Sequence, residues 1–194
     1  MLSASRRSKF EDFSDDILMD ILDCLRPPVY IYHSFYNLNH RLNRIISDAR
    51  LLISLDLSSI VNPSNFAYHC QIMLPNMSKQ LIFLRLSNEP KLYEQIRIFL
   101  QQVNLTSFHA LRQLCLIQIT FQQLKRMLTD ILSLSRLSRL DIDMFDGSGV
   151  SLNELYLIAN TLISKSTSIK VRVELSFLYS SIVQRPRRRH SQPH

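Results

Sequence analysis

The sequence predicts an α/β chain built from a three-helix N-terminal module followed by a short solenoid of parallel strands with outer helices. Three observations predict this class. A helical pattern near the N-terminus ends at two consecutive prolines. A doublet of the form leucine–X–leucine then recurs at intervals of 29, 30, 26 and 33 residues. Each of these intervals also carries an amphipathic helix pattern. Self-similarity with a period of this length is typical of solenoids.

The N-terminal module begins with a capped helix. Ser14 suits the N-cap, and Asp15 and Asp16 follow in the first turn, where the helix dipole stabilises negative charge. Pro27 and Pro28 cannot continue this helix. Its apolar residues fall on one face of a 3.6-residue period and are Ile17, Leu18, Ile21, Leu22 and Leu25.

Two further helices complete the module. The aromatic-rich segment 30–36 predicts the second helix. Asn37 or Asn39 suits the cap of the third, which carries Leu42, Ile45 and Ile46.

The doublets predict strands, because alternating residues of a strand point to opposite faces of a sheet. We expect the doublet residues to point inward. They are Leu55 and Leu57, Leu84 and Leu86, Leu114 and Leu116, Leu140 and Ile142, and, more loosely, Val173 and Leu175.

Helix patterns fill the intervals between the doublets. Pro63 and Pro90 open the first two, since proline is tolerated in the first helical turn. The apolar positions are Phe66, Cys70, Met73 and Leu74; Leu92, Ile96, Phe99, Leu100 and Val103; Phe121, Leu124, Leu128 and Ile131; and Leu152, Leu155, Ala159 and Leu162. One strand and one helix per repeat predict a curved parallel sheet.

Charge divides the chain into a neutral body and basic ends. The net charge is +7, yet residues 11–174 hold all 16 acidic residues and 16 of the 23 basic ones. We therefore expect a basic disordered N-terminus at 1–9, the helical module at 10–48, the strand–helix array at 51–183 and a basic disordered tail at 184–194. The tail sequence RPRRRH has three readings: a nuclear-import tract, a weak polyanion contact or a solvated tail.

Composition excludes several function classes. The chain has two glycines, both in the segment DGSG, whereas phosphate-cradling loops need several. Three widely spaced cysteines form no CxxC motif, which favours buried thiols in a reducing, intracellular compartment. The longest apolar runs are too short to span a membrane. The N-terminus lacks the apolar stretch of a secretory signal.

No metal or catalytic pattern emerges. The histidines lack ligand spacing, and the calcium-loop-like segment 140–149 has Leu152 where the terminal glutamate would stand. A nucleophile elbow of the GxSxG type is missing. We therefore expect no enzymatic activity, no cofactor and no metal.

The segment FEDFSDDILMDILDCLRP, followed by FYNLNHRLNRII, resembles an F-box over residues 10–46. Phe13 and Ser14 stand where the family pattern has leucine–proline, and Asn39 and Leu42 replace a cysteine and a tryptophan. The doublet array over residues 51–180 looks like the leucine-rich repeats commonly fused to F-boxes, without the asparagine that often follows the doublet. The resemblance implies a substrate-recognition adaptor of an SCF-type (cullin–RING) ubiquitin ligase, which docks the SCF adaptor subunit, and through it a cullin, while its repeats bind a target protein.

Two residue sets follow from this reading. Adaptor binding is expected from Phe13, Ile17, Leu18, Ile21, Leu22, Leu25, Pro27, Leu38 and Leu42. Strand alternation predicts a concave target-binding face made of Ser54, Asp56, Ser58, Phe83, Arg85, Ser87, Gln113, Cys115, Ile117, Arg139, Asp141 and Asp143. Phe83 and Ile117 are the candidate apolar anchors.

Two other readings stay open. In one, the module is a structural cap on the first repeat of a protein-interaction solenoid that enters no ligase, because solenoid ends need capping. In the other, the basic tails bind nucleic acid in the nucleus. Aromatic residues interleaved with those arginines are missing, which counts against nucleic-acid binding.

Overall fold

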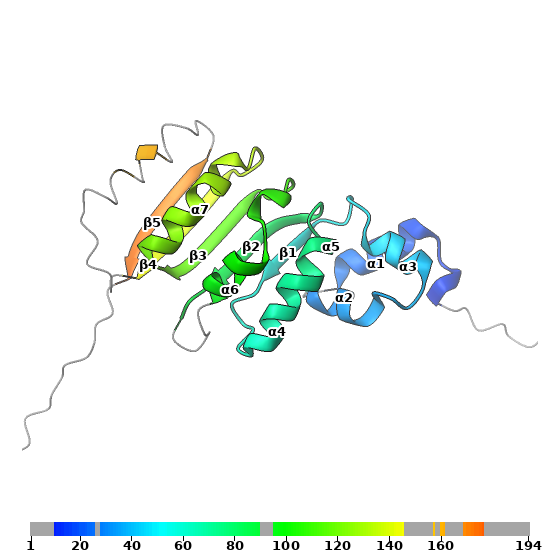
Figure 1. The fold of residues 1–194 in the computed structure, drawn as a ribbon. Helices are drawn as coiled ribbons and strands as arrows, with labels where there is room; N and C mark the ends of the chain where they lie inside the picture. The colour runs from blue at the N-terminus through cyan, green and yellow to red at the C-terminus, as the bar shows by residue number, and fades with distance from the viewer. Residues whose placement is uncertain are drawn as a thin grey trace, which may run out of the picture.

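The chain forms an α/β structure with one parallel five-stranded sheet, described here from a computed structural model. The structure describes residues 10–25, 28–89, 95–145, 157, 160–161 and 169–176. Strand order in the sheet follows the chain, β1-β2-β3-β4-β5, and every neighbouring pair is parallel. In Figure 1 the N-terminal helices lie beyond the β1 edge. Parallel neighbours in chain order require a crossover between each pair of strands.

The sheet consists of β1 (Ile53–Asp56), β2 (Leu81–Ser87), β3 (Gln113–Ile119), β4 (Arg139–Phe145) and β5 (Lys170–Ser176). The α-helices are α1 (Asp15–Cys24), α2 (Pro28–Phe35), α3 (His40–Ile46), α4 (Pro63–Tyr68), α5 (Leu74–Asn76), α6 (Gln95–Gln102) and α7 (Phe121–Ser133). A π-helical turn, η2 (His69–Met73), joins α4 to α5, and 3-10 turns occur at η1 (Phe10–Asp12) and η3 (Leu105–Ser107).

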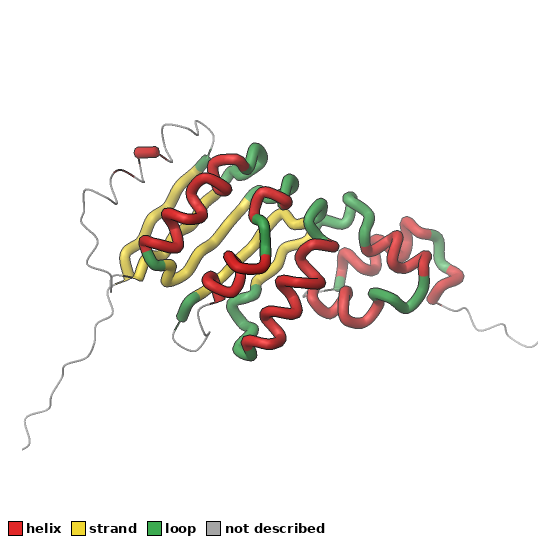
Figure 2. The backbone as a smooth tube through the Cα atoms, in the orientation of Figure 1, coloured by secondary structure: helices red, strands yellow, loops and turns green. Residues whose placement is uncertain are grey.

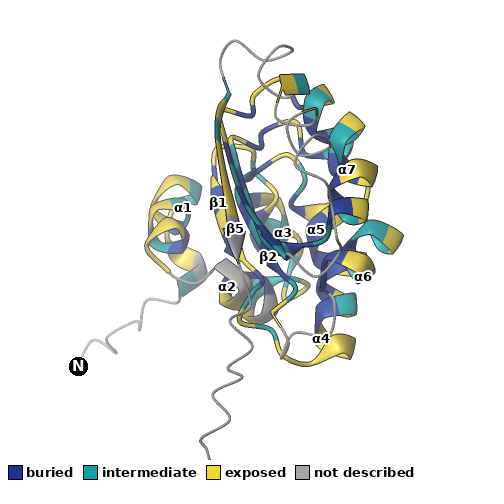
Figure 3. Cartoon of the chain, turned by 90° about the vertical axis from the view of Figure 1, so that its left-hand side faces the viewer, coloured by how far each residue is buried: buried dark blue, intermediate teal, exposed yellow. Residues whose placement is uncertain are grey.

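Helices α4, α6 and α7 cover one face of the sheet, as Figures 2 and 3 show. The other face carries no helix among the described residues between β1 and β5, and we call it the open face. Apolar strand residues are therefore buried on the face that the helices cover, and the core lies between the sheet and the helices.

The inward orientation of the doublets is confirmed for the first four strands. The exposed fraction of their side chains is between 0% and 2%. Val173 of β5 is 43% exposed, although its register partner Ile142 is buried. Val173 belongs to the last strand of the sheet, where only one neighbouring strand shields it.

The described intervening helices bury most of the predicted stripe, while Leu100, Val103 and Leu128 are only half-buried. Phe66, Phe99, Leu124 and Ile131 are buried against the strands. In α7, however, Met127 is fully buried and Leu128 only half-buried. The two side chains are 100° apart on the helix, and the stripe passes through Met127.

Caps delimit the N-terminal helices as expected. Ser14 accepts a hydrogen bond from the backbone N–H of Ile17 at 3.4 Å. Asn39, rather than Asn37, caps α3, because its Oδ1 accepts from the N–H of Leu42 at 2.8 Å. Asn37 instead occupies the left-handed turn before α3, with φ of 64°, a region that asparagine tolerates.

A buried glutamine joins the helical module to the sheet. Gln80 is 1% exposed and precedes β2. Its Nε2 donates to the carbonyls of Ile46, at the end of α3, and Asp48, both at 2.6 Å. The carbonyl of Asp48 also accepts from the N–H of Leu51 at 3.0 Å, whereas that of Ile46 lies at the helix end, where carbonyls lack a partner within the helix. Gln80 thus fixes the module against the β1 side.

A second buried glutamine fixes the carboxyl ends of β1 and β2. Gln95 opens α6 and is 1% exposed. Its Nε2 donates to the carbonyl of Leu57 at 3.0 Å and to that of Ile60 at 2.8 Å. Its Oε1 accepts from the N–H of Ser87 at 3.4 Å.

A β-bulge interrupts the pairing of β3 with β4. Leu116 pairs with Ile142 and Ile119 pairs with Met144, so two β3 residues oppose one β4 residue. Gln118 takes φ of 52° at this point. Bulges of this kind redirect side chains near the end of a strand.

Several sequence predictions lie outside the described residues. They concern the basic ends at 1–9 and 184–194, the site at Pro27, the helix start at Pro90 with Leu92, and most of the fourth helix pattern at residues 152–162. The side chain of Leu175 is likewise undescribed. Within the described part of the chain, no helix is long and apolar enough to cross a membrane.

Candidate functional site

An exposed apolar stripe runs along α1. Phe13, Ile17 and Leu25 have 41%, 46% and 39% of their surface exposed, and Ile21 is half-buried. Ile17 and Ile21 lie one helical turn apart on the same side of α1, and Phe13 and Leu25 continue the four-residue spacing just before and just after the helix. We call these four residues the α1 stripe. An exposed isoleucine or leucine alone is ordinary, but an aligned row of them marks a candidate contact surface.

The other predicted adaptor-binding residues divide between core and surface. Leu18, Leu22 and Leu42 are 0%, 0% and 2% exposed and form the core of the module. Their side chains are buried in the module, so the predicted residues that lie at its surface are Leu38 and the α1 stripe. Leu38 is 63% exposed. Their burial has a simple cause: three short helices need the most central apolar residues for their own packing.

Aromatic contacts connect Leu38 to the start of the α1 stripe. The ring of Phe13 meets Phe10 edge-to-face at 6.4 Å, and Phe10 stacks on Phe35 at 5.7 Å. The N–H of Leu38 donates to the carbonyl of Phe35 at 3.4 Å. Phe13 and Leu38 thus flank one aromatic cluster.

The α1 stripe faces away from the first strand. Met19 and Asp23, on the other side of α1, line a small hollow with Leu51 and Leu52, which lead into β1. Ile17 lies about 160° around the helix from Met19, at 100° per residue. Figure 3 shows α1 standing clear of the sheet.

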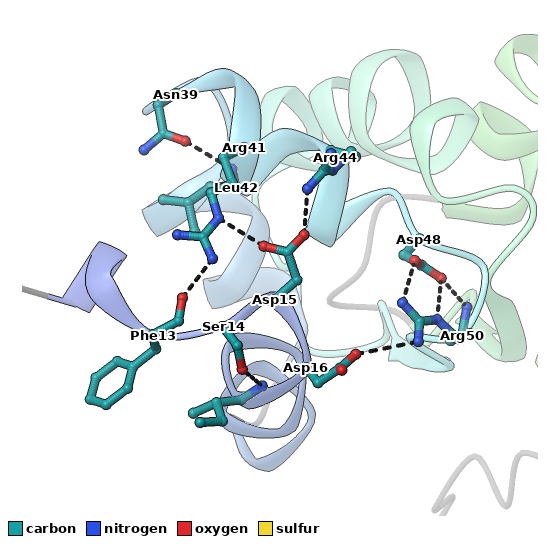
Figure 4. Close-up of polar contacts among 11 residues, drawn as sticks. Phe13, Ser14, Asp15, Asp16, Asn39, Arg41, Leu42, Arg44, Asp48 and Arg50 are labelled. Carbon is teal, nitrogen blue, oxygen red and sulfur yellow. Dashed lines mark hydrogen bonds and ion pairs between the residues drawn. The ribbon is translucent and has the colours of Figure 1, made fainter.

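Ion pairs between one carboxylate of α1 and two arginines of α3 hold the two helices together (Figure 4). Asp15 accepts from Arg41 Nε at 2.7 Å and also forms an ion pair with Arg44. The hydrogen bond from Arg41 is the main reason that the pKa of Asp15 is lower than its ordinary value, and the charges of both arginines add to the effect. Arg41 also donates to the carbonyl of Phe13. Asp15 therefore orients the start of the α1 stripe, in addition to the capping role expected from its position.

A second ion-pair group lies at the module–sheet junction (Figure 4). Arg50 pairs with Asp48 at 3.1 Å and with Asp16 at 3.5 Å. Hydrogen bonds from Arg50 lower the pKa of Asp48. The pairs join α1 to the segment that leads into β1, which sets the angle of the module.

The open face of the sheet carries a row of side chains across all five strands, and four of them are charged. The register aligns Asp56, Arg85, Cys115, Asp141 and Arg172. Asp56 pairs with Arg85 at 3.6 Å. Along β4 and β5, Asp141 pairs with Arg139 at 2.8 Å and Arg172 pairs with Glu174. Such exposed pairs are each worth about 0.2–1 kcal/mol, so they shape recognition more than stability.

Two polar atoms in this row are buried without a hydrogen-bond partner. They are Nε of Arg85 and Oδ1 of Asp141, on either side of Cys115. Burial raises the pKa of the Cys115 thiol. A hollow of about 400 Å³ opens above these residues. An unpartnered donor and acceptor in one hollow suit a ligand that offers both groups, such as a peptide amide.

Most of the predicted target-binding set lies on the open face. Ser54, Asp56 and Arg139 are exposed. The candidate anchors Phe83 and Ile117 are only half-buried, as are the members Ser58, Arg85, Gln113, Cys115, Asp141 and Asp143.

The predicted place of Ser87 on the target-binding face is wrong. Ser87 is fully buried, with its Oγ accepting from the N–H of Glu89 at 3.1 Å and its own N–H donating to Gln95. The end of β2 turns toward α6 at this point, so alternation fails there.

Sequence alternation did not identify the residues just before the strands. Arg112 and Ser138 line a hollow of about 510 Å³ with Phe83, Arg139 and Lys170. They stand at the amino ends of β3 and β4, one position before the alternating segment. A basic residue directly ahead of a strand pattern is the signal that would have found them.

Among the described residues, no group of three or more histidine, cysteine, aspartate or glutamate side chains is arranged to hold a metal ion. Compared with protein-family models and with curated proteins, the chain matches none. The functional assignment therefore depends on the two surfaces and the residues that build them.

Proposed function

We propose that the chain is the substrate-recognition adaptor of an SCF-type ubiquitin ligase inside the cell. Its N-terminal module acts as a divergent F-box that docks the ligase adaptor. Its strand–helix array acts as a short leucine-rich-repeat solenoid that holds a target protein. The chain itself performs no chemistry, and its contribution to ubiquitin transfer is proximity.

The α1 stripe is the observation that carries this proposal. The module closes its own core with Leu18, Leu22 and Leu42, yet leaves Ile17 and Leu25 exposed. Their exposure costs hydrophobic free energy that a partner surface would recover, at roughly 25 cal/mol per Å² buried. The ion pairs of Asp15 hold this side of α1 in a fixed orientation. A pre-oriented apolar surface loses little entropy on binding.

A second reading, the structural cap, is favoured by one observation. Gln80 and the α2–β1 contact attach the module to the first strand. A cap uses only this attached side, however, and the cap reading leaves the α1 stripe without a role. Binding of nucleic acid by the basic tails, which the sequence disfavours, stays an untested alternative, because residues 184–194 lie outside the described part of the chain.

The test is retention of a purified SCF adaptor–cullin pair by the immobilised full chain. The test variant is Ile17→Asp with Leu25→Asp, which places charge on the α1 stripe without touching the core. Leu22→Asp is unsuitable because Leu22 is fully buried. The matched control is Val61→Asp, since Val61 is 55% exposed and lies beyond β1.

Wild type and Val61→Asp should retain the pair, and the double variant should lose at least about thirtyfold in affinity, the scale of an interface hot spot. Circular dichroism checks that each variant is folded. Failure of the wild type to bind at micromolar concentration would reject the ligase role. Equal binding by the double variant would move the docking surface away from α1.

A further inference from the structure

The open face is electrostatically polarised along its strands. At the amino ends, Arg139 and Lys170 are register partners on β4 and β5, and Arg112 stands just before β3. At the carboxyl ends, Asp143 and Glu174 are register partners. Four residues separate Lys170 from Glu174, about 13 Å at roughly 3.3 Å per residue. This exceeds the Debye length of about 8 Å at physiological salt, so a ligand senses the two ends separately.

The hollow at the amino ends is lined by cations and contains no acid. Its lining residues are Ser54, Ile82, Phe83, Arg112, Gln113, Ser138, Arg139 and Lys170. We call it the amino-end hollow, and its volume is about 510 Å³. The hollow therefore combines three positive charges, hydroxyl and amide groups, and one aromatic side chain.

Two of the three cations have no carboxylate to neutralise them. On the open face, Arg85, Arg139 and Arg172 each form an ion pair. In the described part of the chain, Arg112 and Lys170 form none. Two uncompensated cations and a third held by Asp141 make this hollow the most positive part of the described open face.

We propose that the amino-end hollow binds carboxylates of an acidic segment of the target protein. The inference rests on the proposed function in one respect, namely that the segment belongs to a target held by the array. Arg112 and Lys170 would receive the carboxylates, Ser54 and Ser138 offer hydroxyl donors, and the half-buried ring of Phe83 would contact an apolar residue beside the acids.

The geometry disfavours a nucleic acid in the same place. The three cations span β3 to β5, two interstrand spacings or about 10 Å. Nucleic-acid binding commonly relies on 6–10 phosphate contacts. A short acidic segment can be held by the three cations of the hollow alone.

The experiment is a titration of the ¹⁵N-labelled full chain, followed by backbone amide shifts, with three peptide probes and one oligonucleotide probe. The first is an eight-residue peptide containing four glutamates and one leucine. The second replaces the glutamates with lysines, and the third replaces two glutamates with phosphoserines. A single-stranded oligonucleotide serves as the polyanion probe. Amide shifts report binding up to millimolar dissociation constants, so weak peptide affinity remains measurable.

The test variant is Arg112→Ala with Lys170→Ala. Its matched control is Lys125→Ala with Arg126→Ala, which removes the same charge from two exposed residues of α7. The glutamate peptide should shift the amides of residues 112–113, 138–139 and 170 in wild type and in the control. The test variant should bind it about tenfold more weakly.

Four outcomes would overturn the proposal: no shifts at the hollow with the glutamate peptide, equal weakening in both variants, binding of the phosphoserine peptide alone, or tighter binding of the oligonucleotide at the same residues. Adaptor retention measured on the same variants keeps the two ideas apart. Absence of peptide binding by the wild type, with adaptor binding intact, would refute only the hollow. Loss of wild-type adaptor binding would refute the ligase role and leave the hollow as an acidic-peptide site.

Discussion

Replacing Gln95 by methionine should destabilise the carboxyl edge of the sheet by a predictable amount. Methionine has a similar length and fills the same space, so the change removes hydrogen bonds and leaves packing nearly intact. Gln95 donates to the carbonyls of Leu57 and Ile60 and accepts from the N–H of Ser87. The question is how many of these groups lose their last partner.

The three hydrogen bonds of Gln95 differ in whether the partner group keeps another hydrogen bond after the substitution. The carbonyl of Leu57 also accepts from the N–H of Ile60 at 3.1 Å, so it keeps a partner. The carbonyl of Ile60 and the N–H of Ser87 lose the bond that Gln95 supplies. A buried group left unsatisfied costs about 1–3 kcal/mol, and the 3.4 Å bond from Ser87 is weak. We expect a total loss of about 2 kcal/mol.

The measurement is urea unfolding followed by circular dichroism, with thermal unfolding as a second readout. A loss of about 2 kcal/mol corresponds to a fall of about 4–8 °C in the midpoint temperature for a chain of this size. Gln101→Met is the matched control, since Gln101 lies exposed on the same helix. Its effect should stay within about 0.5 kcal/mol. If the two variants were equally stable, the hydrogen bonds of Gln95 would not be what holds β1, β2 and α6 together.

Three further predictions concern the module and the thiols. Leu22→Ala should cost about 3 kcal/mol in urea unfolding because it leaves a cavity in the core, whereas Ile17→Ala should cost less than 1 kcal/mol because Ile17 is exposed. The pKa of Asp15 is lowered in the folded state, so the stability it adds is complete above the unfolded value near 3.8 and disappears as the pH falls through the folded pKa. The midpoint difference between wild type and Asp15→Asn should therefore be constant at neutral pH and vanish in acid. Burial raises the pKa of Cys70 to about 12, so a thiol reagent at pH 8 should modify the exposed Cys24 rapidly and Cys70 only after unfolding.

Each of the three predictions would be contradicted by a specific result. Equal costs for Leu22→Ala and Ile17→Ala would mean that α1 is not packed as described. A stability difference at Asp15 that persists in strong acid would point to packing instead of its ion pairs with Arg41 and Arg44. Rapid labelling of Cys70 in the native state would show that α4 and η2 open readily.

Periodicity predicted the parts of the fold in which one side of an element must be apolar. The doublets Leu84–Leu86 and Leu114–Leu116 are buried as expected, because a strand covered on one face has only one place for its leucines. The same reasoning predicted α1, and it left Asn37 and Asn39 as alternatives for the cap of α3, of which the structure shows Asn39. These features follow from local rules that a single sequence contains in full.

The same local rules did not predict which polar residues are buried. Gln80 and Gln95 are 1% exposed, yet glutamine is usually a surface residue. Their burial depends on carbonyls that lie 32–38 residues away along the chain. The burial of Ser87 was also missed; its Oγ accepts from the N–H of Glu89, and its backbone N–H donates to Gln95. Alternation predicts the side of a strand and carries no information on what a distant loop supplies.

The sequence predicted which segments carry the candidate surfaces, and only the structure showed which of their residues are exposed. Helical spacing placed Ile17, Leu18 and Leu22 together, and packing of α1 on α3 then divided them between surface and core. Arg112 and Lys170 carry no periodic signal. Parallel register brings them to one hollow, although 58 residues separate them in sequence.

The arrangement of the two surfaces bears on whether one chain can hold two partners. The module attaches at β1, and the cations of the amino-end hollow lie on β3 to β5. With neighbouring strands about 4.8 Å apart, these strands are roughly 10–19 Å across the sheet from β1. Sites separated by more than about 10 Å with no shared contacts usually act independently. The scaffold proposal therefore requires that Ile17→Asp and Arg112→Ala each impair one binding event and leave the other unchanged. A chain in which either change impaired both would be a coupled switch, because a rigid sheet of parallel strands gives no route for one surface to alter the other without a change in the array itself.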